Sequence, residues 1–598
     1  MGVAVFQSFE TEFSGATGPE RLGKLRAAMA RIGVDGFIVP RTDMFQGEYV
    51  APGDERLAWL TGFSGSAGFA VAMREAAAIF VDGRYRIQVR QQVDPVFEPV
   101  DWPETTLAQW IAERAAVQVI AYDPWLHTVD EIAKLAESGA ELRPVANLID
   151  PLWQDRPAAP TALFFAQPDE LAGEGAASKR YRLAEGLKSK GQRAAVITLT
   201  DSVAWLLNIR GADIAHNPVP QAYAILHDDG RCDLFCGPEK TAEIAEHLGA
   251  EVTVHGFDRL TEVLGQLPGP IRIDPSSCPQ VIAQALAAAG VTTVEGQDPC
   301  VLPKAIKNPV ELDGMRAAHR RDAIAMCRFL AWMAQVATTG ITEIDVVERL
   351  EQFRRDTNAL REISFDTISG TGPNGAVIHY RVTHDSNRTL ADGDLIVVDS
   401  GGQYVDGTTD ITRTLAVGTV GEEERRCYTQ VLRGVIAISR ARFPVGVAGA
   451  HLDALARQFL WADGLDYDHG TGHGVGAYLC VHEGPQRISR LSTLPLEPGM
   501  ILSNEPGYYR PGAFGIRIEN LIAVCEAPAL PGGDAHRKYL GFETLTWVPL
   551  DRRLIDAGLM SRDEVAWVDE YHRNVLDKLV PDLDAVTQQW VTAACAPL

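Results

Sequence analysis

The chain has 598 residues, of which 46% are hydrophobic and 22% charged, the proportions of an ordinary globular protein. One hydrophobic core does not support this length, so we expect several domains. The net charge of −24 argues against nucleic acid or an anionic membrane as the main partner. No apolar run is long enough to span a bilayer and the first residues lack a signal-peptide pattern, so we expect a cytoplasmic protein.

The cysteines are few and scattered. Their odd number and irregular spacing do not match a disulfide framework. Cys232 and Cys236 form a close pair that no second pair accompanies. We therefore expect two ordinary buried thiols there in preference to a structural zinc site.

The first half of the chain contains a diverged repeat. Each copy has a basic amphipathic helix, a short apolar strand and then a helix with the sequence Ala-Trp-Leu. These segments are 21–32, 37–39 and 58–60 in the first copy, and 179–190, 195–197 and 204–206 in the second. The alternation of helix and strand favours α/β units with a largely buried sheet.

Two breaks divide the chain. Residues 151–160 have the proline content of a linker, and a second break at 298–303 precedes a predicted long helix. Asn308 suits the N-cap of this helix and Pro309 its first position. The predicted domains are therefore 1–160, 161–305 and 306–598.

The last domain ends in a predicted helical tail. Ser561 and Glu564 have the spacing of a capping box at its start. Apolar residues then follow at helical spacing: Val565, Val568, Tyr571, Val575 and Leu579. This stripe predicts a packing face, either on the same subunit or on a dimer partner.

Residues 370–375 match the dinucleotide-binding pattern GxGxxG letter for letter. That fingerprint needs a helix that opens at the last glycine and holds the pyrophosphate. Here Pro373 lies inside the motif, and residues 376–380 have the composition of a strand. We therefore predict a glycine-rich turn between strands and no nucleotide site.

Acidic residues stand on several apolar strands of the C-terminal half. Residues 395–398 predict a buried strand that ends in Asp399, and a second strand at 408–414 carries Asp410. A hairpin would bring the two carboxylates side by side. Carboxylates so placed among apolar neighbours repel each other unless a cation holds them.

Two further acids and a histidine follow. Glu505 ends the apolar strand 501–504, and Glu519 shares the polar face of an alternating strand with Arg517. His473 lies in a segment with four glycines, which excludes a stable helix and lets the imidazole approach another group closely.

Together these residues predict a site for two metal ions. The ligands are Asp399, Asp410, His473, Glu505 and Glu519. Taken singly, each is more readily explained as a strand end or a core histidine, but five on a series of strands favour a metal site. Four carboxylates balance two divalent cations, and oxygen-rich ligation favours Mn²⁺, with Co²⁺, Zn²⁺ or Fe²⁺ as alternatives. Two such ions roughly 3.5–4 Å apart would generate a bridging hydroxide near neutral pH.

The motifs around these residues resemble those of the pita-bread metallopeptidases, most closely the long, three-domain aminopeptidase P (Xaa-Pro aminopeptidase) family. They are VVDSGGQY, TTDITRT, HGTGHGVG, SNEPGYY and GIRIEN. The resemblance extends through GFSGSAG at 62–68, DGRY at 82–85 and the tail LGFETLTWVPLD at 540–551. It implies an α/β and α+β architecture, with two creatinase-type α/β domains followed by a pita-bread catalytic domain.

The resemblance also implies a reaction, the hydrolysis of the first peptide bond when the second residue is proline. The attacking group is then the metal-bridging hydroxide, and Glu505 shuttles its proton to the leaving nitrogen. His379 and His482 are expected to contact the scissile carbonyl and the proline. His469 and Arg517 are expected to orient ligands and carry protons.

Weaker expectations concern the pocket and the assembly. Phe365 and Val481 are predicted pocket walls, although ordinary core packing explains each equally well. The resemblance implies a homodimer. The competing interpretations are a prolidase, which cleaves only dipeptides, and a non-catalytic peptide-binding homologue. The intact set of five ligands argues against the latter, and the length of the chain argues against the former.

Overall fold

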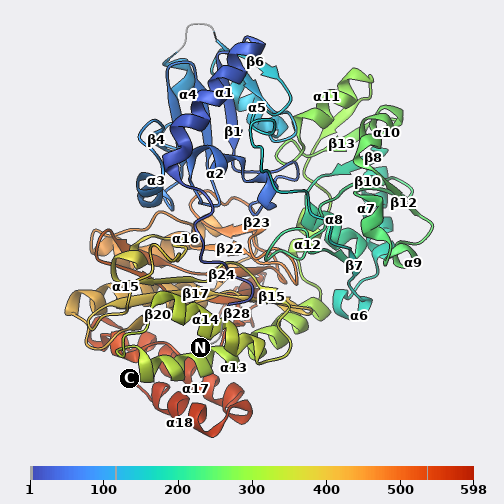
Figure 1. Cartoon of the computed structure of the whole chain (residues 1–598). Helices are drawn as coiled ribbons and strands as arrows, with labels where there is room; N and C mark the ends of the chain where they lie inside the picture. The colour runs from blue at the N-terminus through green and yellow to red at the C-terminus, as the bar shows by residue number, and fades with distance from the viewer. Residues whose placement is uncertain (1–3, 115–117, 535) are drawn as a thin grey trace. The chain divides into compact units, whose positions relative to one another are not determined.

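The computed structural model describes residues 4–114, 118–534 and 536–598. It forms two compact units, one of Glu12–Val301 and one of Met1–Thr11 with Leu302–Leu598. In Figure 1 the first unit runs from blue to green, and most of the second runs from green to red. No described helix is both long and apolar enough to cross a membrane.

The unit Glu12–Val301 contains two six-stranded sheets. The first has the order β4 (Glu98–Asp101), β3 (Ala77–Val81), β2 (Phe69–Met73), β1 (Gly36–Pro40), β5 (Val119–Tyr122) and β6 (Glu141–Pro144). The second has the order β12 (Val252–His255), β11 (Cys232–Phe235), β10 (Tyr223–His227), β8 (Ala194–Ile197), β13 (Ile271–Ile273) and β14 (Thr293–Glu295). A short pair, β7 (Phe165–Ala166) and β9 (Ile209–Arg210), accompanies the second sheet.

The two sheets share one topology, which confirms the predicted repeat. In each, the first strand in the chain lies centrally, antiparallel to the next strand on one side and parallel to a later strand on the other. The helices of the first copy are α1 (Gly18–Ile32), α2 (Arg56–Thr61), α3 (Arg86–Gln92), α4 (Leu107–Ala112) and α5 (Val129–Ala136). Those of the second are α6 (Asp169–Ala172), α7 (Ala176–Ser189), α8 (Thr200–Leu207), α9 (Ala245–Leu248), α10 (Leu260–Gln266) and α11 (Gln280–Ala288). Cys232 and Cys236 are buried free thiols.

The second unit carries a long helix where one was predicted. A short helix, α12 (Val301–Ala305), precedes α13 (Pro309–Val336). The side chain of Asn308 accepts hydrogen bonds from the backbone N–H groups of Val310 and Glu311, which closes a capping box. The next helix, α14 (Glu343–Arg355), packs on α13.

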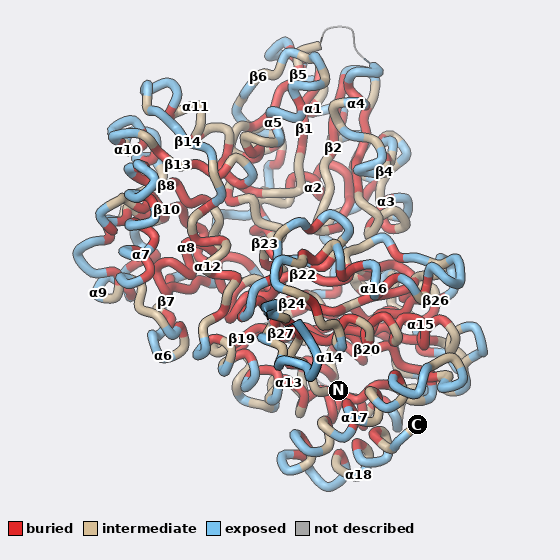
Figure 2. Tube along the Cα trace, turned by 180° about the vertical axis from the view of Figure 1, so that it is seen from behind, coloured by how far each residue is buried: buried red, intermediate tan, exposed pale blue. Residues whose placement is uncertain are grey.

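The sheets of this unit are small except for one. The largest has the order β21 (Phe443–Pro444), β28 (Tyr539–Thr544), β27 (Asn520–Glu526), β24 (Ile501–Asn504), β22 (Gly472–Gly474) and β23 (Glu483–Ile488). The others are β16 (Ile368–Thr371), β17 (Leu395–Ser400) and β20 (Ile411–Ala416); β15 (Glu362–Ile363), β18 (Gly402–Tyr404) and β19 (Gly407–Thr408); and β25 (Gly507–Arg510) with β26 (Phe514–Arg517). Helices α15 (Glu422–Ser439) and α16 (Gly449–Ala462) pack together over them. Figure 2 shows these strands as largely buried and the connecting loops as exposed.

Two predicted strands are interrupted at the acids they carry. The strand predicted at 408–414 divides into β19 and β20, and Asp410 lies in the gap. The strand through Arg517 and Glu519 divides into β26 and β27, with Glu519 in the gap. An unbroken strand would direct successive side chains to opposite faces, so each gap frees its acid from that alternation.

The predicted strand at 376–380 is wrong. A 3₁₀ helix covers Gly372–Ala376 instead, and no strand follows it before β17. The turn closes on the buried carboxylate of Glu343, which accepts hydrogen bonds from Thr371 N–H (2.7 Å), Asn374 Nδ2 (3.1 Å) and Tyr380 OH (3.0 Å). These bonds from a distant helix outweigh the strand propensity of the segment. No α-helix opens at Gly375, as predicted.

The C-terminal helices are α17 (Arg562–Leu579) and α18 (Ala585–Ala594). The predicted capping box is confirmed, because Ser561 Oγ accepts from Glu564 N–H and Glu564 accepts from Ser561 N–H. Val568, Tyr571, Val575 and Leu579 lie in the core of the same chain, whereas Val565 is only half-buried. Helices α17 and α18 pack beside α13 in Figure 1, so the stripe serves the chain's own fold.

A fully buried ion pair holds the hairpin that precedes β20. Arg354 Nε of α14 donates to Asp322 Oδ1 of α13 at 2.7 Å, and neither side chain has exposed surface. Asp322 also accepts from Tyr404 OH (2.7 Å) and Thr409 Oγ1 (3.0 Å), on either side of the hairpin turn. The pair therefore fixes the residue immediately before Asp410.

We expect Asp322→Ala to destabilise the second unit by about 3–5 kcal/mol, because it leaves the Arg354 guanidinium buried without its partner. Replacing both charges, Asp322→Leu with Arg354→Met, should restore part of this loss, since no uncompensated charge remains. Differential scanning calorimetry of the three proteins measures both effects. A single variant that unfolds like the parent would contradict the assignment.

Candidate metal centre

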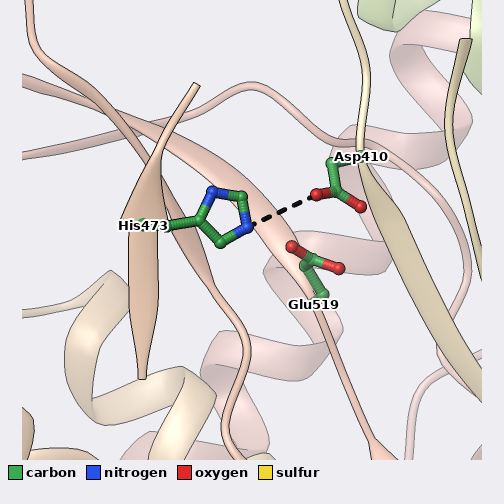
Figure 3. A group of neighbouring side chains, drawn as sticks. All are labelled: Asp410, His473 and Glu519. Carbon is green, nitrogen blue, oxygen red and sulfur yellow. Dashed lines mark ion pairs between the residues drawn. The ribbon is translucent and has the colours of Figure 1, made fainter. Parts of the chain in front are cut away.

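Three predicted ligands converge from three separate segments of the chain. Asp410 comes from the gap between β19 and β20, His473 from β22 and Glu519 from the gap between β26 and β27. One ligand atom of each lies within 4.8 Å of one ligand atom of the others. Figure 3 shows the imidazole of His473 pointing at the two carboxylates, with Nε2 at 3.5 Å from Asp410 Oδ2.

The remaining two acids lie around this group. Glu505 Oε1 is also 3.5 Å from His473 Nε2. Burial raises the pKa of both Asp410 and Glu505, and each pKa is raised further by the charge of Asp399, near the end of β17. Its Oδ2 accepts from Arg517 Nη2 at 2.6 Å and from Nε at 3.1 Å. The structure thus places the five predicted ligands and Arg517 near one another, with Asp399, Asp410 and Glu519 buried and with His473 and Glu505 partly exposed.

The negative charges of these carboxylates repel one another. Burial raises the pKa of Asp410 well above its usual range, and the charges of Asp399 and Glu505 raise it further. Burial also raises the pKa of Glu519, followed by the charges of Asp410, Glu505 and Asp399. Arg517 keeps its positive charge despite burial, because Tyr509, Asp399 and Glu505 raise its pKa. One guanidinium cannot balance four acids.

Carboxylate oxygens without hydrogen-bond partners also fit a site for metal ions. Asp399 Oδ1, Asp410 Oδ1 and Glu519 Oε1 are buried and have no hydrogen-bond partner among the described residues. Buried acceptors are almost always paired, so three orphaned oxygens in one place need an explanation. Divalent cations, for which carboxylate oxygen is a preferred ligand, provide it.

Glycine lets the histidine segment enter the sheet. A Cβ atom at Gly472 would lie 2.0 Å from the carbonyl oxygen of Ser503 on β24. His473 N–H donates to Ser503 Oγ (2.9 Å), and that hydroxyl donates to Glu505 Oε1 (3.2 Å). One serine therefore positions two of the candidate ligands. Ser503 lies within the motif SNEPGYY, but the sequence alone does not indicate this role.

A buried ion pair on α16 holds the loop that leads to His473. Arg457 of α16 donates to Asp453 Oδ2 (2.7 Å) and to the carbonyl oxygens of Tyr467 (2.7 Å) and His469 (2.6 Å). Asp453 in turn accepts from Thr471 Oγ1 at 2.6 Å. Sequence reasoning missed this pair, because no local pattern links a helix to a loop ten or more residues away.

Tyr509 joins two predicted site residues into a chain of hydrogen bonds. Its hydroxyl lies 2.9 Å from His469 Nε2 and accepts from Arg517 Nη1 at 2.7 Å. The hydrogen bonds thus run from His469 through Tyr509 and Arg517 to Asp399. Sequence reasoning missed Tyr509, although it closes the motif SNEPGYY and pairs opposite Gly515 in the β25–β26 hairpin.

Of the other predicted histidines, His482 contacts the cluster and His379 follows a residue that does. The ring of His482 lies edge-on to that of His473, with centroids 4.4 Å apart. His379 is half-buried, and Arg517 Nη1 donates to the carbonyl of its neighbour Ile378 at 3.2 Å. Of the predicted pocket walls, Phe365 retains 9% exposure and Val481 none. Core packing is therefore the simpler account of Val481 in this state.

We expect Mn²⁺ to raise the unfolding midpoint of the EDTA-treated protein. The free energy of unfolding should rise by about 2.7 kcal/mol for each site, when free Mn²⁺ is at one hundred times the Kd of that site. Asp410→Asn with Glu519→Gln should have two opposite effects. The metal-free protein becomes more stable because repulsion falls, and the Mn²⁺-induced shift shrinks because ligands are lost.

Asp406→Asn is the matched control for this thermal-shift measurement. Asp406 lies on the same hairpin, but it is paired with Arg321 at 3.0 Å, outside the cluster. Its variant should keep the full Mn²⁺-induced shift. An unchanged shift in the double variant would refute the metal centre.

Family models match most of the chain. "Metallopeptidase family M24" matches residues 313–526, and "C-terminal region of peptidase_M24" matches 538–598. "Creatinase/Prolidase N-terminal domain" models match 21–152 and 155–311. The two N-terminal matches each contain one of the six-stranded sheets.

Individual relatives match almost the full length. A probable Xaa-Pro aminopeptidase P of Laccaria bicolor is 40% identical, over 97% of this chain and 93% of its own. The crystal structure of an X-prolyl aminopeptidase from Caenorhabditis elegans, described as a cytosolic enzyme with a di-nuclear active site, is 32% identical with a TM-score of 0.93, over 97% of this chain and 100% of that one. A dipeptidase PepE structure from Mycobacterium ulcerans is 27% identical with a TM-score of 0.51 and covers 64% of this chain and 97% of its own. The fold, the cluster and these matches together place the chain in the aminopeptidase P family of M24 metallopeptidases.

Proposed function

We propose that this chain is a metal-dependent aminopeptidase that hydrolyses the first peptide bond of peptides whose second residue is proline. The observation that carries the proposal is the cluster of Asp399, Asp410, His473, Glu505 and Glu519, in which three buried carboxylate oxygens have no hydrogen-bond partner among the described residues. The full-length similarity to proteins named Xaa-Pro aminopeptidase supports the choice of substrate.

Two divalent ions fit the cluster by charge, since four carboxylates carry four negative charges. When bound, such a pair polarises a carbonyl oxygen and supplies a nucleophilic water at neutral pH. Mn²⁺ is our first choice, because the ligand set holds four carboxylates, one imidazole and no thiolate. Co²⁺, Zn²⁺ and Fe²⁺ are compatible with the same set.

The chain's own residues then have distinct roles. Glu505, bonded to Ser503 and next to His473, is placed to accept a proton from the attacking water and pass it to the leaving nitrogen. His379 and His482 are proposed to contact the scissile carbonyl and the proline. The chain of hydrogen bonds from His469 to Arg517 fixes Asp399 and provides a route for protons.

Proline specificity follows from the chemistry of the bond. An X-Pro bond is a tertiary amide without an N–H group, so a site that depends on that donor cannot hold it. A dedicated apolar surface for the ring is then required. Phe365 remains our candidate for one wall and Val481 for the other, the latter only if substrate binding exposes it.

The alternatives have less support. A prolidase-like dipeptidase shares the catalytic fold, but the dipeptidase structure matches 64% of this chain, whereas the aminopeptidase structure matches 97%. A non-catalytic peptide-binding homologue would be expected to have lost ligands, and all five are present.

Two broader expectations remain proposals. We propose a cytoplasmic location, supported by nine free cysteines and by the description of the Caenorhabditis elegans relative as cytosolic. We also propose a homodimer, which a sedimentation measurement that finds only monomer would refute.

We expect the Mn²⁺-loaded protein to release arginine from Arg-Pro-Pro and to leave Arg-Ala-Ala uncut, as followed by mass spectrometry. The dipeptide Arg-Pro tests the prolidase alternative, and it should be cleaved far more slowly than the tripeptide. Equal cleavage of Arg-Pro-Pro and Arg-Ala-Ala would exclude proline specificity, and cleavage of neither would exclude the activity.

We expect His379→Ala and His482→Ala each to lower kcat/KM for Arg-Pro-Pro by about 10²–10³, the usual effect of removing one donor to developing charge. Because neither histidine is a proposed ligand, the metal content by mass spectrometry should stay at the parent value. His451→Ala, an exposed histidine on α16, is the control and should leave kcat/KM unchanged. Loss of metal from His379→Ala or His482→Ala would contradict these roles.

A further inference from the structure

Arg413 of β20 is a guanidinium without exposed surface that lies behind the metal centre. Its hydrogen-bond partners among the described residues are six neutral oxygen atoms and no carboxylate. They are the carbonyls of Thr412 (2.8 Å), Glu519 (2.6 Å), Val548 (2.7 Å) and Pro549 (3.0 Å), Asn520 Oδ1 (2.9 Å) and Tyr571 OH (3.0 Å). Taking a charge out of water costs several kcal/mol, so the burial of Arg413 without a carboxylate partner requires an explanation.

One side of the guanidinium holds a candidate ligand. Nη1 donates to the carbonyl oxygens of both Thr412 and Glu519. The side chains of these two residues are joined as well, because Thr412 Oγ1 donates to Glu519 Oε2 at 2.8 Å. Glu519 N–H also donates to the Thr412 carbonyl at 3.1 Å. Arg413 therefore fixes the backbone at the gap between β26 and β27, from which the Glu519 carboxylate reaches the cluster.

The other side contacts Asn520 of β27 and is otherwise held by the C-terminal region. Val548 and Pro549 supply carbonyl oxygens, and α17 supplies the hydroxyl of Tyr571. That hydroxyl accepts from Arg413 and from Val548 N–H (3.1 Å). Its own hydrogen reaches the Val548 carbonyl at 2.9 Å or the Thr546 carbonyl at 3.1 Å.

The ring of Tyr571 is fixed as firmly as its hydroxyl. It is stacked between Trp547 (centroids 5.4 Å apart) and Trp567 (5.3 Å). A planar group with five donors can reach three chain segments at once, which a lysine ammonium cannot. The contacts thus form a continuous path from α17 through Tyr571 and Arg413 to Glu519.

We propose that the C-terminal region, residues 538–598, is a working part of the metal centre: Tyr571 positions Arg413, and Arg413 positions Glu519 for metal binding. The inference rests on the proposed metal-dependent function and assigns that function a structural requirement outside the M24 segment 313–526. Both residues are positioning residues, since neither side chain is a candidate ligand.

The test is a Mn²⁺ titration of the metal-free, full-length chain by isothermal calorimetry. Tyr571→Phe removes one oxygen and keeps the stacked ring. We expect it to weaken one of the two bound ions by about 10- to 100-fold, the usual effect of losing a group that orients a metal ligand. Arg413→Lys, which keeps the charge and loses the fork, should weaken the same ion. The electron paramagnetic resonance spectrum of the bound Mn²⁺ should change in both variants.

The matched control destabilises the same region without touching this path. Asp584 caps α18 through Thr587 N–H (3.0 Å) and makes none of the contacts of Arg413 or Tyr571. Asp584→Ala should lower the unfolding midpoint and leave both Mn²⁺ affinities and the spectrum unchanged.

Excess Mn²⁺ should restore the kcat of Tyr571→Phe, because its defect is in metal affinity.

Three results would overturn the proposal: parent-like Mn²⁺ affinity in Tyr571→Phe, an equal loss of affinity in Asp584→Ala, or a kcat that excess Mn²⁺ does not restore. Failure of the parent chain itself to bind two Mn²⁺ ions would instead reject the proposed function. The two failures are therefore distinguishable in one set of titrations.

Discussion

Four carboxylates gathered around one imidazole, three of them buried, oppose folding by their mutual repulsion, and bound cations relieve that repulsion. Asp410 and Glu519 illustrate the conflict most clearly, because burial and the neighbouring acids both raise their pKa. The backbone around them has adapted to the same constraint. Both acids occupy gaps between strands, where their side chains are released from the alternation that a continuous strand would impose.

The positions of these acids are held by buried polar networks. Asp322 and Arg354 fix the hairpin before Asp410, and Asp453 with Arg457 fixes the loop before His473. Buried ion pairs contribute little net stability compared with apolar packing, so their presence is better explained by the geometry they enforce. A metal centre tolerates little displacement of its ligands, which gives that geometry its value.

The first unit is recognised by its repeated topology, and the second by the short motifs at its site. In the first unit, two sheets of different sequence have the same strand order, although the lengths of their loops differ. In the second unit, short motifs are concentrated at the site. The C-terminal helices belong to the core of this unit, which explains why the apolar stripe on α17 is used within the chain.

Much of the fold could be predicted because its signals are local. Asn308 and Ser561 cap the helices that they were expected to begin, since a cap depends only on the next three residues. The four acidic ligands were recognisable because each ends or interrupts an apolar strand, and His473 because it lies among glycines. The strand expected at 376–380 failed for the opposite reason, because the buried Glu343 on α14 binds the segment as a turn.

The sequence by itself determined the helix caps, the repeat, the five acidic and imidazole side chains and the family they belong to. The tertiary structure decided which distant groups hold them: Glu343, Tyr509, Arg457, and Arg413 with Tyr571. Tyr509 and Arg413 lie within the motifs SNEPGYY and TTDITRT, but no local pattern shows what these residues contact. Each acts on a segment that the fold brings to it. A sequence pattern reveals a hydrogen bond only when its two partners are close together in the chain, as in a helix cap.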